Sequence, residues 1–286
     1  MNGYNLGGHS GCQIILMENN DGFVFVRKIS KDIVYNQRLE KQCEKQAAFV
    51  REGDIKAPAI YNSGINEDGL FFFDMEYIQG ITLAEKIKSY EIGKIRGIVE
   101  ILVKNLIPAE RKIETPEEAE RTRNIFSIKI GELNSKLTKY NNDVVNQALE
   151  LLKSYDWTKF TPSQCHGDMT LENIIVKNDS LYFIDFLDSF YDSWLLDIGT
   201  LLQDVQVLWS YRFSKNVSMN TMLRLIVFRD ILMDEIEKLN PSYIIDVYYA
   251  LLQKLIRIFP YVKDDITYDF LTKKTGIVVN KIREFN

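Results

Sequence analysis

The sequence has few cysteines and histidines and no long apolar run. Its 286 residues include three cysteines without a Cys-x-x-Cys spacing, so no disulfide framework or zinc site is indicated. Two histidines, His9 and His166, are too few for a histidine-rich metal site. Charged residues interrupt the most apolar stretches before they reach the ~18 residues of a membrane span. These absences predict a reduced, cytoplasmic protein with no membrane span.

Clustered positive charge is also missing. Lysine and arginine total 35 against 40 aspartates and glutamates, which gives a formal net charge of -5. Nucleic-acid binding needs clustered cations, so we expect no nucleic-acid partner. The first residues are polar and glycine-rich and carry no apolar targeting segment. With 46% hydrophobic residues, the chain has enough apolar side chains for a folded core.

Residues 1–79 have the pattern of a small antiparallel sheet. Two Asp-Gly pairs, at 21–22 and 68–69, are typical of tight turns between antiparallel strands. A segment between the two hairpins has apolar residues at helical spacing. The predicted elements are strands at 12–17, 22–29, 59–65 and 70–78, and a helix at 31–52.

Residues 80–286 are mainly of helical pattern. The helical run is interrupted at 163–186, where a polar loop precedes two short strands, 174–177 and 181–185. The sequence therefore predicts an α+β fold in two parts: an N-terminal lobe at 1–79 and a larger helical lobe at 80–286 that carries the embedded hairpin. Nothing in the pattern indicates an oligomeric state.

Three oxygen-bearing side chains cluster around that hairpin. Asp168 lies on the polar loop, Asn173 follows five residues later, and Asp185 ends the second strand. Phosphoryl transfer needs a carboxylate that orients the attacking hydroxyl and accepts its proton, and hard oxygen ligands for Mg²⁺ on the nucleotide phosphates. The spacing therefore indicates a phosphotransferase site.

At these residues the chain resembles a known family. His166-Gly167-Asp168 with Asn173, then Ile184-Asp185-Phe186 and Asp197-Ile198-Gly199, are similar to the motifs of the aminoglycoside phosphotransferase and choline kinase family. These enzymes are small-molecule kinases with a bilobal protein-kinase-like fold. The resemblance extends from about Gly7 to Asp204; the later helices match only in character.

The resemblance assigns roles to individual residues. It implies that Asp168 is the catalytic base and that Asn173 and Asp185 hold Mg²⁺, with ATP or GTP as co-substrate. It implies further that Asp197 supports the catalytic loop and that His166 packs this loop against the strand of Asp185.

A kinase-like N-terminal lobe also needs a lysine on the phosphates and a helix glutamate that holds it. We favour Lys28 and Glu44, which lie sixteen residues apart. Two alternatives stay open at this point. Arg27 is adjacent to Lys28, and neighbouring strand residues face opposite sides. Glu40 lies one helical turn before Glu44.

Two further segments fit a nucleotide site. Gly7 to Gly11 is a candidate phosphate-covering loop, although glycines near a chain start more often mark flexibility. Met75 to Gly80 resembles the family's hinge, where backbone groups around Glu76 and Tyr77 would bind the nucleotide base.

Other functions compete with a small-molecule kinase. One is a catalytically inactive nucleotide-binding or scaffold protein on the same fold, which the retained base and metal ligands disfavour. A protein kinase is disfavoured because Gly167 stands where protein kinases place an arginine. In addition, only eleven residues separate Asp185 from Asp197, too few for a long activation loop.

The acceptor is expected beyond Asp185. Asp188, Asp192 and Trp194 lie in that region, and carboxylates with an aromatic face suit an amine or a quaternary ammonium. An amino alcohol or amino sugar would carry such a group. In the alternative interpretation the acids are solvated and the rings belong to the core, which leaves a neutral sugar as acceptor.

Overall fold

The computed structural model describes residues 2–6, 11–49, 53–108, 110, 114–137, 140, 142–214 and 217–285. Its contacts divide the chain into two compact units. The first unit comprises Met1–Lys86, His166–Asp168 and Glu172–Ser189, and the second comprises Ile87–Cys165, Met169–Leu171 and Phe190–Asn286. The embedded hairpin and part of the polar loop before it, His166–Asp168, thus group with the N-terminal sheet, whereas the sequence pattern assigns them to the helical lobe.

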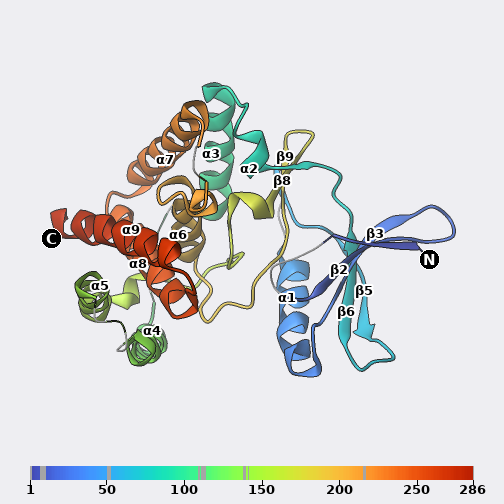
Figure 1. The fold of residues 1–286 in the computed structure, drawn as a ribbon, viewed down its shortest axis with the longest axis horizontal. Coiled ribbons are helices and arrows are strands. Elements are labelled where there is room, and N and C mark those ends of the chain that lie inside the picture. Colours follow the sequence, from blue (N-terminus) through green and yellow to red (C-terminus); the bar gives the residue numbers. More distant parts are fainter. Residues whose placement is uncertain are drawn as a thin grey trace. The chain divides into compact units, whose positions relative to one another are not determined.

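A five-stranded antiparallel sheet forms the centre of the first unit (Figure 1). Its strands, in spatial order, are β1 (Asn2–Asn5), β2 (Gln13–Glu18), β3 (Val24–Ile29), β6 (Phe71–Glu76) and β5 (Ile60–Ile65). Both predicted hairpins are present, because β2 pairs with β3 and β5 pairs with β6. The β3–β6 pairing places Lys28 opposite Phe73, in the middle of the sheet.

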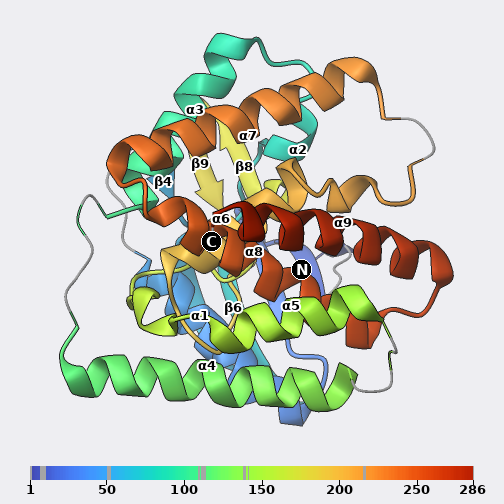
Figure 2. The same ribbon diagram turned by 90° about the vertical axis from the view of Figure 1, so that its left-hand side faces the viewer.

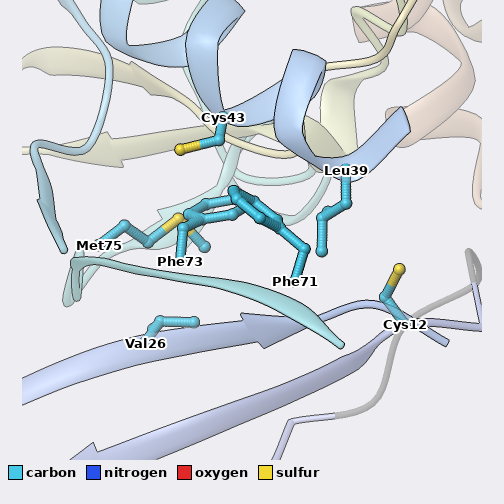
Figure 3. Close-up of a cluster of buried hydrophobic side chains, with 7 residues drawn as sticks. All are labelled: Cys12, Val26, Leu39, Cys43, Phe71, Phe73 and Met75. Carbon is cyan, nitrogen blue, oxygen red and sulfur yellow. The ribbon is translucent and has the colours of Figure 1, made fainter. Parts of the chain in front are cut away.

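Helix α1 (Asn36–Ala48) packs against β6 of this sheet. Leu39 and Cys43 point from the helix toward Phe71 and Phe73, as Figure 3 shows. Val26, Met75 and Cys12 complete this buried cluster. The cluster fixes which side of α1 faces the sheet. It therefore also determines which polar residues of the helix lie beside the site.

A second, smaller sheet also belongs to the first unit. Its strands, in spatial order, are β4 (Ile55–Lys56), β9 (Ser180–Phe183), β8 (Ile174–Lys177) and β7 (Ile81–Thr82). The β8–β9 hairpin agrees with the predicted embedded hairpin. The two-residue strands β4 and β7 have no periodic pattern of their own, and they form because they add to the edges of this hairpin. The four-residue helix α2 (Leu83–Lys86) follows β7.

The second unit is helical. Its helices are α3 (Ile92–Leu106), α4 (Pro116–Leu137), α5 (Asp143–Ser154), α6 (Trp194–Val205), α7 (Met219–Leu239), α8 (Tyr243–Ile258) and α9 (Asp265–Glu284). Helix α6 is buried along its whole length and packs against α8. Figure 2 shows α3 alongside α7, and α8 beside α9. Among the described helices, none combines the length and the apolar character that crossing a bilayer requires.

The helix predicted at 31–52 is shorter in the structure. The Asp32 carboxylate accepts the Tyr35 N–H, which starts a one-turn 3-10 helix at Ile33–Tyr35 before α1 begins. Asp side chains commonly hold such turns, because they compete with the helical hydrogen bonds of the backbone. Helix α1 ends at Ala48, four residues before the predicted end at residue 52.

The contact between α6 and α8 depends on Gly199. A Cβ atom added there would lie 2.9 Å from the Ala250 backbone carbon and 2.9 Å from its Cβ. We expect Gly199→Ala to lower the free energy of unfolding by about 1–3 kcal/mol, because the buried helices must separate. Chemical denaturation followed by circular dichroism measures this change.

Gly131→Ala in α4 is the matched control for this prediction. A Cβ at Gly131 would meet nothing within 4 Å. Alanine there should raise stability by about 0.5–1 kcal/mol, because glycine is a poor helix former. Equal effects of the two substitutions would contradict the close packing of α6 on α8.

Candidate active site

Lys28 projects from β3 into the interior of the first unit. Its side chain is 3% exposed, and its Nζ forms an ion pair with Asp185. Nζ also donates a hydrogen bond to Gln42 Oε1 at 3.2 Å. A buried ammonium is costly unless charged and polar groups surround it, so these two partners hold the lysine in place.

Arg27 faces the other side of the strand. Its guanidinium makes a two-point ion pair with Asp74 of β6, at 2.7 and 2.8 Å, and lies over the Phe72 ring. The hydrogen bond to Asp74 raises the pKa of Arg27, although burial opposes this shift. Because strand neighbours alternate in direction, Lys28 and not Arg27 is the cation that meets Asp185.

The expected pair between Lys28 and Glu44 is wrong. Successive helix residues are about 100° apart, and the buried face of α1 is set by Leu39, Cys43 and Gln46. Glu44 and Glu40 are both exposed. Gln42 lies on the buried face and takes the position beside Lys28. The residues at 39, 42, 43 and 46 follow the spacing of one helix face, and this spacing is the sequence signal that would have identified Gln42.

His166 connects the catalytic loop to the strand before Asp185. Its Nε2 lies 2.7 Å from the Ile184 carbonyl oxygen, which can only accept, so Nε2 carries the proton. Its Nδ1 accepts the Asp168 N–H at 3.2 Å. The ring also packs against Phe183 and Phe186. One neutral imidazole thus fixes the backbone on both sides of the site.

Asn173 holds Asp168 directly. Its Nδ2 donates to the Asp168 carbonyl oxygen at 2.8 Å and lies 3.4 Å from Asp168 Oδ2. With the amide nitrogen turned toward the loop, Oδ1 is the atom of Asn173 suited to a metal ion. The backbone of Asn173 also accepts the Ile184 N–H at 3.0 Å, so the loop and the hairpin support each other.

Asp185 follows β9 in a left-handed backbone conformation, with a φ of 61°. Non-glycine residues seldom adopt this region, and those that do often lie at functional sites. Its side chain is 42% exposed although it pairs with the buried Lys28. The carboxylate therefore has one side toward the lysine and another toward solvent.

The segment after Asp185 packs tightly against Gly167. The Leu187 N–H donates to the His166 carbonyl oxygen at 3.1 Å. Lys45 of α1 donates to the Leu187 carbonyl oxygen at 3.0 Å and lies 3.3 Å from Ser189 Oγ. Sequence reasoning missed Lys45, because it is one of several lysines on a polar helix and its partner is a backbone oxygen far along the chain.

The two residues predicted to form the hinge, Glu76 and Tyr77, lie at and directly after the end of β6. The Glu76 N–H donates to the Ala59 carbonyl oxygen at 2.8 Å, and Tyr77 is exposed. Gly11, the last residue of the candidate phosphate-covering loop, has a φ of 77°. The rest of that candidate, residues 7–10, lies outside the described residues.

Two buried aspartates of α6 contact the catalytic-loop residues that belong to the second unit. The Cys165 thiol, immediately before His166 in the chain, donates to Asp197 Oδ1 at 3.3 Å. Asp204 accepts the Leu171 N–H at 2.9 Å and the Ser210 hydroxyl at 2.7 Å. Asp204 is thus a buried support of the loop.

The structure corrects one of the acceptor residues. Trp194 is 2% exposed and packs edge-on against Tyr243 at 5.0 Å between ring centroids, so it belongs to the core. It is the first residue of α6, and its apolar neighbours Leu195 and Leu196 are equally buried. Asp188 is half-buried and Asp192 is exposed.

The described residues contain no cluster of three or more His, Cys, Asp or Glu side chains that could hold a metal ion. The two predicted metal ligands, Asn173 and Asp185, offer only one amide and one carboxylate, which lie before and after the same hairpin. Mg²⁺ commonly takes one or two such protein ligands, with water and substrate phosphates completing its shell.

Comparison with known proteins identifies the family. A model of the phosphotransferase enzyme family matches residues 17–220, which include Lys28, Asp168 and Asp185. The chain belongs to this family. It is therefore a small-molecule kinase, and the expected enzyme class is confirmed. No curated protein matches the chain.

Solved structures of kinases share the fold of this phosphotransferase. Amicoumacin kinase hAmiN, in complex with AMP-PNP, Ca²⁺ and Ami, has a TM-score of 0.62 at 11% identity and covers 99% of this chain and 92% of its own. A thermostable mutant of aminoglycoside phosphotransferase APH(4)-Ia, with ADP and hygromycin B, has a TM-score of 0.60 at 12% identity, with coverages of 98% and 93%.

An ethanolamine kinase of Plasmodium vivax has the same fold, with a TM-score of 0.53 at 15% identity and coverages of 97% and 81%. The predicted α+β, bilobal kinase-like fold of this phosphotransferase is confirmed.

Gly167 gives a test of the geometry of the loop. Its φ is 96°, and an added Cβ would lie 2.3 Å from Ser189 Oγ and 2.8 Å from the Leu187 carbonyl oxygen. We expect Gly167→Ala to cost about 1–3 kcal/mol of stability from backbone strain alone, and to lower phosphotransfer as the loop shifts. Thermal unfolding and turnover of the purified variant measure both effects.

Gly53→Ala separates strain from crowding. Gly53 also has a positive φ, of 81°, but a Cβ there would meet nothing within 4 Å. This control should lose stability while keeping its turnover. If both variants keep full turnover, the packing of Leu187 and Ser189 against Gly167 does not matter for catalysis.

Proposed function

We propose that this phosphotransferase moves the γ-phosphate of ATP or GTP to a hydroxyl group of a small molecule, namely an amino alcohol, an amino sugar or a sugar. Asp168 is the base, and Asn173 and Asp185 hold Mg²⁺. The observation that carries the proposal is one connected set of contacts in the first unit. Asn173 holds Asp168, and Lys28 pairs with Asp185 on the hairpin that Asn173 begins.

Asp168 has the surroundings of a general base. Its backbone is held by His166 and Asn173, and Asn173 lies beside its Oδ2. Oδ1 is then the atom that accepts the proton of the acceptor hydroxyl, while the hydroxyl oxygen attacks phosphorus. Holding the carboxylate in one orientation matters, because a general base acts only within hydrogen-bond reach of the proton.

The donor set also fits Mg²⁺, because the Asp185 carboxylate and the Asn173 amide oxygen are hard oxygen ligands. When bound, the ion would neutralise charge on the nucleotide phosphates. Lys28 supplies a further positive charge in the same unit. At the predicted hinge, the Glu76 N–H already donates to the Ala59 carbonyl oxygen. The Glu76 carbonyl and the backbone of Tyr77 would therefore bind the nucleotide base.

Cytoplasmic location is part of the same proposal, since this class of co-substrate is intracellular and the three cysteines form no disulfide. The alternative is an inactive nucleotide-binding or scaffold protein. It is less well supported, because the base, the metal ligands and the lysine are all present, with Asn173 bonded to Asp168 and Lys28 paired with Asp185.

Asp168→Asn tests the base. Turnover should fall roughly 10²- to 10⁴-fold, because the amide cannot accept the proton, while nucleotide affinity stays nearly unchanged. Turnover is measured as ADP or GDP release with choline, ethanolamine, amino sugars, simple sugars and aminoglycosides. Glu172→Gln, an exposed carboxylate on the same loop, is the control and should keep its turnover. Normal turnover of Asp168→Asn would refute the assignment.

The acceptor class can be tested separately. Asp188 and Asp192 remain as carboxylates beyond Asp185, so we expect a cationic alcohol to be phosphorylated in preference to its neutral isostere. A competition assay with matched pairs measures this preference, and Asp188→Asn should reduce it. Equal or better use of the neutral members would favour a neutral sugar as acceptor and leave the phosphotransferase assignment intact.

A further inference from the structure

The polar side chains that α1 turns toward the site carry no negative charge. Gln42 is 3% exposed and accepts a hydrogen bond from Lys28 Nζ at 3.2 Å. Lys45 binds the Leu187 carbonyl oxygen. The two glutamates on this stretch of the helix, Glu40 and Glu44, are exposed. The helix therefore contacts Lys28 through a neutral amide.

Gln42 is held in one orientation. Its Nε2 donates to the Tyr35 hydroxyl at 3.2 Å, so its Oε1 is the atom left for the ammonium. Tyr35 precedes α1 directly and has the Lys31 ammonium 4.8 Å from its ring centroid. If the amide turned over, its Nε2 would face the ammonium, and the hydrogen bond to Lys28 would be lost because both groups are donors.

The charge of Lys28 must then be balanced elsewhere. A buried cation is costly without an opposite charge, and Asp185 supplies this charge in the structure. If Asp185 binds a metal ion together with the nucleotide, its negative charge is shared with that ion. The phosphates are then the groups that take over as the counter-charge of Lys28.

We propose that Gln42 is the positioning residue of Lys28: it holds the ammonium by a neutral hydrogen bond while Lys28 exchanges Asp185 for the nucleotide phosphates. This inference rests on the proposed function. Gln42 keeps the direction of the side chain constant through the exchange without competing for its charge, because an amide oxygen accepts a hydrogen bond but offers no ion pair.

The test compares two leucine substitutions on the same helix face. Gln42→Leu removes the acceptor for Lys28. Gln46→Leu is the matched control, because Gln46 is also 3% exposed but contacts Pro58 and Met75 instead. Calorimetry measures the binding of ADP and of GDP, each with and without Mg²⁺, and thermal unfolding compares the stabilities of the variants.

We expect Gln42→Leu to weaken the tighter of the two nucleotides by about 10-fold, the effect of losing a hydrogen bond to a charged group. Gln46→Leu should stay within about 2-fold of the original protein at a similar loss of stability. Gln42→Glu should restore binding only in part, to about 3-fold weaker than the original protein. Its carboxylate accepts from Lys28, and the Tyr35 hydroxyl can donate to the other oxygen, but the negative charge competes with the phosphates for the ammonium.

The outcomes separate this inference from the function on which it rests. Unchanged nucleotide binding by Gln42→Leu, or equal weakening by both leucine variants, would overturn the positioning role. Failure of Gln42→Glu to restore binding would overturn it as well. Failure of the unsubstituted protein to bind either nucleotide would instead overturn the proposed function.

Discussion

The ion pair between Lys28 and Asp185 is the interaction on which the first unit depends. Lys28 lies in the middle of the five-stranded sheet, and Asp185 follows the hairpin of the smaller sheet, 157 residues away in the chain. A buried ammonium must have an opposite charge beside it. Phe49 at the end of α1 packs on Phe183 and Phe186 to either side of Asp185, so apolar contacts support the same junction. The pair thereby brings the lysine proposed to face the nucleotide and the carboxylate proposed to hold the metal ion into one structural unit.

The catalytic loop is held by a different kind of contact. Its polar side chains are used on the backbone: His166 bonds to Ile184 and Asp168, Asn173 to Asp168, and Asp204 to Leu171. A buried backbone N–H or C=O group without a hydrogen-bond partner would cost free energy. Each of these bonds therefore supplies a partner for a backbone group and fixes the path of the loop. The loop has no regular structure apart from one short 3-10 turn at Leu171–Asn173. Hydrogen bonds from side chains replace the backbone–backbone hydrogen bonds that a helix or a sheet would provide.

The sequence predicts most of the fold, and it also predicts that Asp168, Asn173 and Asp185 come together at the site. Hairpins with Asp-Gly turns and periodic helices are local features, and the structure has both hairpins and long helices beyond residue 80. The motif residues Asp168, Asn173 and Asp185 are close in the chain, so their association is also nearly local. The partner of Lys28 could not be predicted in the same way. It depends on how α1 is rotated on the sheet, and Leu39 and Cys43 settle that rotation by packing against Phe71 and Phe73. Trp194 was misassigned for a similar reason, since burial of α6 on all sides is a tertiary property.

The buried cysteines offer an experimental opportunity. All three cysteines are buried and form no disulfide, and burial together with Glu44 and Glu40 raises the pKa of Cys43 to about 11. Thiols react as thiolates, so alkylating reagents at neutral pH should modify these positions slowly. A cysteine introduced at an exposed position, such as Glu172 beside the catalytic loop, would then react selectively without removal of the native thiols. A single fluorophore could thus be attached next to the site and report directly on the arrival of nucleotide in solution.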